Sequence, residues 1–168
     1  MAENFDYEHY LDDEDKLAIL SIGEGGASKT KIQKIAFLLS KALKLDGNFV
    51  AYDFGNFSDT LMEKVESPYN SDLITTSGNK YTLTQNGKDV YHKLLGSLDH
   101  EEKTIAMDIA DTLQRMSVEK IETLVYHLFP ETTDNSVIKL DIEKKIELLK
   151  KDKRVKVTRN NDNVTIEV

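Results

Sequence analysis

Side chains that commonly carry enzymatic chemistry are sparse in this sequence. It has no cysteine, which excludes a thiol nucleophile, a thiolate zinc site and a disulfide framework. None of its four histidines has a second histidine or a carboxylate at a metal-motif spacing such as H-E-x-x-H. The acidic residues 12–15, and Asp99, Glu101 and Glu102 around His100, are typical of the first turn of a helix, where the helix dipole favours negative charge. We therefore expect no catalytic residue, no metal ion, no cofactor and no enzymatic activity.

A glycine-rich segment superficially resembles a phosphate-binding loop. Gly23, Gly25 and Gly26 stand shortly before Ser28-Lys29-Thr30. A phosphate loop follows a strand and has the spacing G-x-x-x-x-G-K-[ST], whereas the apolar residues before these glycines recur at helical spacing. We interpret the glycines as the end of a helix and do not expect nucleotide binding there.

The segments around these residues are mostly helical. Apolar residues recur at helical spacing behind good N-cap residues. The expected helices are residues 12–22, one from Ser28 or Thr30 to Asp46, one from Ser58 to Pro68, one from Thr84 to Gly96, residues 105–116 and 118–128, and one from Asp141.

Strand signals occur in three places. Residues 49–54 are rich in aromatic and β-branched side chains, and we expect them to form a strand or an extended segment that Gly55 ends. Residues 73–76 and 80–83 flank Ser77-Gly78-Asn79, which predicts a β-hairpin. Residues 154–158 and 164–168 alternate apolar and polar side chains around an asparagine-rich turn, which predicts a second hairpin.

The order helix, helix, helix, β-hairpin predicts a winged helix-turn-helix. The expected fold class is α+β, mainly α. We expect a winged helix-turn-helix domain at residues 1–97. A helical extension at residues 98–168, which includes the C-terminal helix and hairpin, is expected to pack on it. The length of 168 residues suits one such domain with an extension.

Three motifs resemble a loose group of prokaryotic winged-helix proteins. They are KIQKIAFLL at residues 31–39, YDFGNFS at residues 52–58, and LI at residues 73–74 with YTLT at residues 81–84 and Gly87. The chain resembles the YwgA-like proteins over roughly residues 12–136 and is more distantly similar to the SocA-like antitoxin domain called Panacea. Asn56 stands where that pattern has proline. The resemblance implies a non-enzymatic regulator or a toxin-neutralising interaction module.

Charge is unevenly placed along the chain. The net charge is −8, from 22 basic and 30 acidic residues. Residues 1–27 carry −7 and residues 99–136 carry −6, whereas the rest of the chain is basic. The densest basic segment, residues 144–159, is either a solvated helix face and hairpin rim or a surface for phosphates or an acidic partner.

The first functional hypothesis is a transcriptional regulator that binds double-stranded DNA as a homodimer. The third helix, which would enter the DNA groove, has two exposed carboxylates, Asp59 and Glu63, and one lysine, Lys64. This charge predicts weak DNA binding by a monomer, so a dimer or the basic C-terminal segment is needed to strengthen it. The predicted DNA contacts are Lys31, Lys34, Thr60, Lys64, Ser77, Asn79, Lys80, Lys150, Lys151, Lys153, Arg154 and Lys156.

The alternative hypothesis is an acidic protein-interaction module, antitoxin-like or an adaptor, that does not bind DNA itself. The aromatic residues Tyr52, Phe54, Phe57 and Tyr69 are then either core residues or an anchor surface for the partner. The acidic N-terminal segment is not a signal peptide, and no apolar run is long enough to span a membrane. We expect a cytoplasmic protein without a membrane partner.

Overall fold

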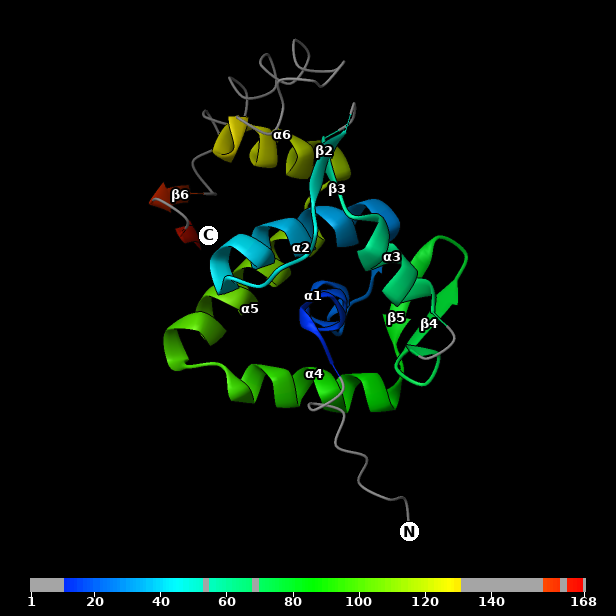
Figure 1. The fold of residues 1–168 in the computed structure, drawn as a ribbon. Coiled ribbons are helices and arrows are strands. Elements are labelled where there is room, and N and C mark those ends of the chain that lie inside the picture. Colours follow the sequence, from blue (N-terminus) through cyan, green and yellow to red (C-terminus); the bar gives the residue numbers. More distant parts are fainter. Residues whose placement is uncertain (1–10, 53–54, 68–69, 131–155, 161–162, 168) are drawn as a thin grey trace.

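The computed structural model describes residues 11–52, 55–67, 70–130, 156–160 and 163–167. Within these ranges the chain is mainly helical, with six α-helices, one three-stranded antiparallel sheet and two two-stranded antiparallel pairs (Figure 1). This agrees with the expected α+β, mainly α class.

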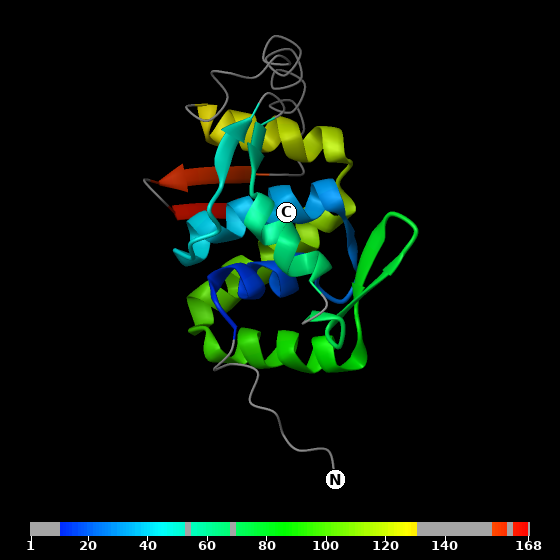
Figure 2. The ribbon, with the colours of Figure 1, turned by 45° about the vertical axis from the view of Figure 1, so that its right-hand side comes forward.

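The first two helices begin and end at the residues that the sequence indicates. Helix α1 (Asp13–Ile22) begins with a capping box between Asp12 and Asp15 and ends at Gly23, whose φ is +57°. Helix α2 (Lys29–Leu43) is capped by Ser28. Residues 32–40 of α2 are all buried, because three helices and three strands pack around it (Figures 1 and 2).

The segment between α2 and the third helix is a short hairpin, of which the prediction over residues 49–54 included the first strand and missed the second. Strand β2 (Val50–Tyr52) pairs with strand β3 (Gly55–Phe57) in the register Val50 to Phe57. Gly55 was expected to end a strand and instead begins one. Ser58 then caps helix α3 (Asp59–Glu66), as predicted.

The three-stranded sheet has the order β1-β5-β4. Strands β4 (Ile74–Ser77) and β5 (Lys80–Leu83) form the predicted hairpin, with Gly78 at φ +60° in its turn. Strand β1 (Ala27–Ser28), which was not predicted, pairs with β5 and has only two residues. Thr84 caps helix α4 (Gln85–Ser97), which runs one residue beyond Gly96.

Helices α5 (His100–Arg115) and α6 (Val118–Leu128) correspond to the two predicted apolar stripes, and both pack against α2. One apolar cluster contains buried residues from all six helices. The core is therefore continuous across residue 97, where a boundary between two parts was predicted.

The predicted C-terminal hairpin is present. Strand β6 (Lys156–Asn160) pairs with strand β7 (Asn163–Glu167), and β7 lies against α5 and α2. The helix expected to start at Asp141 lies outside the described residues. No helix in the described part of the chain is long and apolar enough to cross a membrane.

Candidate functional site

Helix α3 is fixed to α2 through the side chain of Gln33. This side chain is 1% exposed; its Nε2 donates to the carbonyl oxygen of Ser58 at 2.8 Å, and its Oε1 accepts from the amide of Ser58 at 2.9 Å. The Ser58 hydroxyl accepts from the amide of Leu61 at 3.2 Å and donates to the carbonyl of Gly47. Sequence reasoning missed Gln33, although a polar residue inside an apolar helical run is a signal of such a role.

Lys34, a predicted DNA contact, is buried instead. It is 4% exposed, and its Nζ donates to the carbonyl oxygen of Asn56 at 3.1 Å. Burial lowers the pKa of this amine, and the nearby carboxylate of Glu122 acts in the opposite direction. The prediction was wrong because β3 and α6 cover this side of α2, so the ammonium group does not reach the surface.

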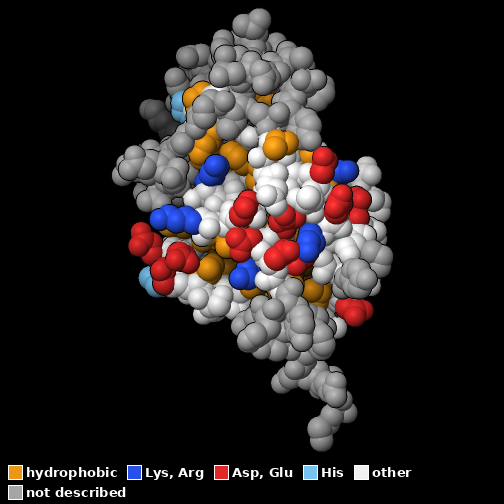
Figure 3. All heavy atoms as spheres, in the orientation of Figure 1, with side chains coloured by type: hydrophobic (Ala, Val, Ile, Leu, Met, Phe, Trp, Pro, Cys, Tyr) orange, Lys and Arg blue, Asp and Glu red, His pale blue; other side chains and the backbone are white. Residues whose placement is uncertain are grey.

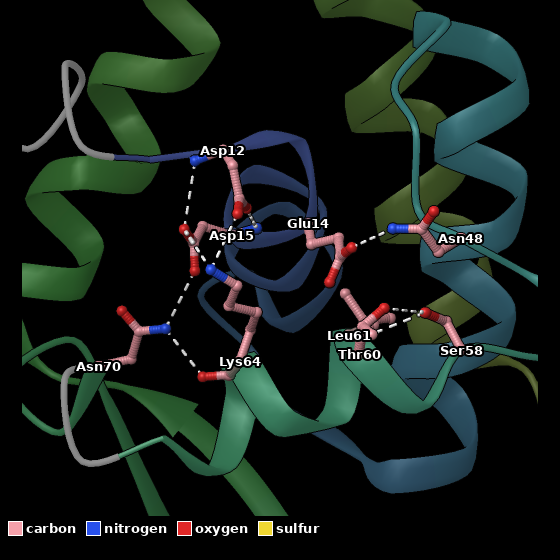
Figure 4. Close-up of polar contacts among 9 residues, drawn as sticks. All are labelled: Asp12, Glu14, Asp15, Asn48, Ser58, Thr60, Leu61, Lys64 and Asn70. Carbon is pink, nitrogen blue, oxygen red and sulfur yellow. Dashed lines mark hydrogen bonds and ion pairs between the residues drawn. The ribbon is translucent and has the colours of Figure 1, made fainter.

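Lys64, another predicted DNA contact, forms ion pairs within the protein (Figure 4). Its Nζ lies 2.8 Å from Oδ2 of Asp12 and 3.8 Å from Oδ2 of Asp15. Asn70 adds hydrogen bonds from its Nδ2 to Asp15 and to the carbonyl of Lys64. The bond to Asp12 raises the pKa of Lys64. The positive charge that was assigned to a phosphate is therefore paired with carboxylates at the start of α1.

The side chains around α3 form an acidic face. We use this name for the exposed or half-exposed carboxylates of α3 and of the neighbouring segments at the start of α1 and after α2. They are Asp12, Asp13, Asp46, Asp59, Glu63 and Glu66. Figure 3 shows acidic side chains spread over this side of the molecule, with several basic side chains among them. Thr60, a predicted DNA contact, is exposed on α3 between them.

Backbone and side-chain bonds hold the segments of the acidic face together. The amide of Asp46 donates to Oδ2 of Asp13 at 2.9 Å, and Asn48 donates to the buried carboxylate of Glu14 (Figure 4). Glu66 accepts a hydrogen bond from the Tyr81 hydroxyl at 2.8 Å. The carboxylates are thus presented by a connected surface of α1, α3 and the loop after α2.

A separate hollow of about 670 Å³ lies between the hairpin β4–β5, the start of α2 and the end of α5. The predicted contacts Asn79, Lys80 and Lys31 line it, and Ser77 is exposed nearby on the hairpin. Lys31 donates through Nζ to the carbonyl oxygen of Gln114 at 2.9 Å. Arg115 also lines the hollow, and sequence reasoning missed it because it lies 84 residues from Lys31 in the chain.

The remaining predicted residues are only partly described. Phe57 is half-buried against the core, with Nζ of Lys29 at 6.0 Å from its ring centroid. Tyr52 and Lys156 lie on β2 and β6, and only their backbones are described. The predicted residues outside the described ranges are Phe54, Tyr69, Lys150, Lys151, Lys153 and Arg154.

Histidine and carboxylate side chains are the candidate metal ligands of a chain without cysteine. The described ranges contain no group of three histidine, aspartate or glutamate side chains placed to hold a metal ion. His92 is paired with Glu24 at 2.7 Å on an exposed surface. Among the described residues, the acidic face and the hollow differ in the charge of the side chains that line them.

Comparison of the chain with protein-family models, curated proteins and solved structures finds no significant match.

Proposed function

We propose that this chain is a winged-helix protein-interaction module, antitoxin-like or an adaptor, whose acidic face binds a basic protein. The order α1, β1, α2, α3, β4, β5 with the sheet order β1-β5-β4 supports the winged-helix assignment. The β2–β3 hairpin is then an insertion between the second and third helices.

The charge around α3 is the observation that carries this proposal. Residues 12–22 and α3 together contain seven acidic and two basic residues, a net charge of −5. One of those two cations, Lys64, is already paired with Asp12. A winged helix that reads DNA places its third helix in the major groove, where the exposed carboxylates of Asp59, Glu63 and Glu66 would face phosphates. The same carboxylates complement a lysine- or arginine-rich protein surface.

An apolar side chain next to the acidic face gives such a partner a place to anchor. Val50 is 51% exposed on β2 and pairs with Phe57, two residues before α3 begins. Apolar contact supplies most of the binding free energy in protein interfaces, while surrounding charges set association rate and partner choice. An acidic helix beside an exposed valine therefore fits a basic partner with an apolar contact residue.

DNA binding by a homodimer, the first hypothesis from the sequence, stays a prediction with less to support it. Lys34 and Lys64 form internal contacts, so the described contacts that remain include few charged groups. Non-specific affinity depends on the number of neutralised phosphates.

The experiment compares three forms of the tagged full chain expressed in its native host. The acidic-face variant is Asp59→Asn, Glu63→Gln and Glu66→Gln, in which each amide keeps the shape of the carboxylate. The control is Asp89→Asn, Glu101→Gln and Asp108→Asn, which removes three exposed charges from α4 and α5. Co-purified proteins are identified and then measured as pure binary complexes.

We expect a basic protein that binds the wild type and the control equally and the acidic-face variant about tenfold more weakly. That factor follows from three exposed ion pairs at about 0.5 kcal/mol each. The proposal fails if no protein distinguishes the acidic-face variant from the control, or if the recovered partner binds both equally.

A further inference from the structure

The charged residues that line the hollow beside the β4–β5 hairpin are mainly basic, in contrast to the acidic face. Three residues with cationic side chains, Lys31, Lys80 and Arg115, line it from α2, β5 and α5, together with one carboxylate residue, Asp111. From this lining we propose that the hollow binds a small phosphomonoester, with the phosphate held by these three cations.

The cations are available for a ligand. Neither Lys80 nor Arg115 forms an ion pair with another described residue, and Lys31 uses one of its three N–H groups on the carbonyl of Gln114. Guanidinium and ammonium groups that converge on one point favour phosphate, which accepts several charge-assisted hydrogen bonds at once. Asn79 on the same rim adds an amide donor.

Gly26 explains how Lys80 reaches the hollow. Its φ is +74°, and a Cβ at this position would lie 2.8 Å from Cε of Lys80, Cγ2 of Thr82 and the carbonyl oxygen of Tyr81. A glycine is therefore required for β5 to approach the loop this closely. The glycine-rich segment was interpreted only as a helix end, and its second role is to let β5, with Lys80, lie close to the loop that lines the hollow.

The volume of the hollow is sufficient for a small molecule. Its volume of about 670 Å³ falls in the range of small-ligand sites. A second hollow of about 260 Å³ adjoins it, since both are lined by Gly25, Asp111 and Gln114, and its lining mixes apolar residues such as Leu95 and Met107 with charged ones such as Glu24 and Lys103. The phosphate thus has a cationic site, and the organic part of the ligand has an adjacent half-apolar one.

The test is a titration of the isotope-labelled full chain by NMR with AMP, with inorganic phosphate and with a random duplex. The site variant is Lys80→Gln and Arg115→Gln. The control variant, Lys93→Gln and Lys120→Gln, removes the same charge from exposed positions of α4 and α6. Lys31 is left unchanged because it also holds the end of α5.

We expect AMP to shift the amide signals of Gly25, Gly26 and Ser28 saturably. The site variant lacks two cations, and at about tenfold for each its affinity for AMP should fall about a hundredfold. The affinity of the control variant for AMP should stay unchanged. The proposal is overturned if neither phosphate compound shifts these signals at millimolar concentration, or if both variants lose binding equally. It is also overturned if only the duplex shifts them, because the hollow would then be a contact for a nucleic-acid backbone.

Discussion

Replacement of Gln33 by leucine tests how α3 is held on α2. Leucine fills a similar volume but cannot bond to Ser58, which is 0% exposed. The Ser58 amide then has no partner, at a cost of about 1–3 kcal/mol, since a buried donor is left unsatisfied. The Ser58 carbonyl keeps the bond from the amide of Met62 and loses only its second one, worth about 1 kcal/mol.

We therefore expect Gln33→Leu to lower the free energy of unfolding by about 2–4 kcal/mol and Tm by roughly 5–15 °C for a chain of this length. Urea denaturation followed by circular dichroism measures the first quantity and a thermal scan the second. Gln85→Leu is the matched control, because Gln85 is exposed on α4 and bonds only to Asp89. If Gln33→Leu were as stable as this control, the pairing of Gln33 with Ser58 would not be what holds α3.

Three further predictions concern Lys34, Gly26 and Lys64. Because burial lowers the folded-state pKa of Lys34, the unfolded chain binds more protons between that pKa and 10.5, and the contribution of Lys34 to stability rises with pH over this window. Urea denaturation at several pH values should show that rise for the wild type and not for Lys34→Met; equal slopes would contradict it. Gly26→Ala should lower Tm, because Gly26 has a positive φ and lies in close contact with β5. Gly96→Ala in α4 is the control, since its Cβ would meet open space, and it should raise the free energy of unfolding by about 0.5–1 kcal/mol. Similar Tm changes in the two variants would contradict the close approach of β5 to Gly26. Lys64→Met should lower the free energy of unfolding by about 0.5–1 kcal/mol, a small value because Lys64 and Asp12 are partly exposed. About 1 M salt should reduce this difference from the wild type. A difference that does not depend on salt would show that packing, not charge, is responsible.

The helix starts could be predicted because their signals are local. Ser58, Thr84 and Ser117 each cap a helix through the amide three residues later, which depends only on neighbouring residues. The β4–β5 hairpin follows from its glycine-containing turn in the same way. Strand β1 could not be predicted, since its two residues are defined by pairing with Tyr81 and Lys80, more than fifty residues away.

The fate of individual lysines could not be predicted for the same reason. Lys34 and Lys64 look like exposed cations in a helical pattern, but their environment is set by Asn56 and Asp12, which belong to other elements. The apolar stripe of α2 indicates contacts on several sides, yet it does not identify which polar residues those contacts cover. The candidate site therefore changed from the lysines of α2 and α3 to the carboxylates around them.

The most direct measurement of the central claim is the fluorescence anisotropy of a labelled random DNA duplex titrated with the wild-type chain at about 50 mM salt, where non-specific binding is strong for DNA-binding proteins. The acidic face around Asp59, Glu63 and Glu66 predicts no saturable rise in anisotropy. Saturable binding that weakens steeply as salt is added would contradict the proposal that α3 serves a basic protein partner.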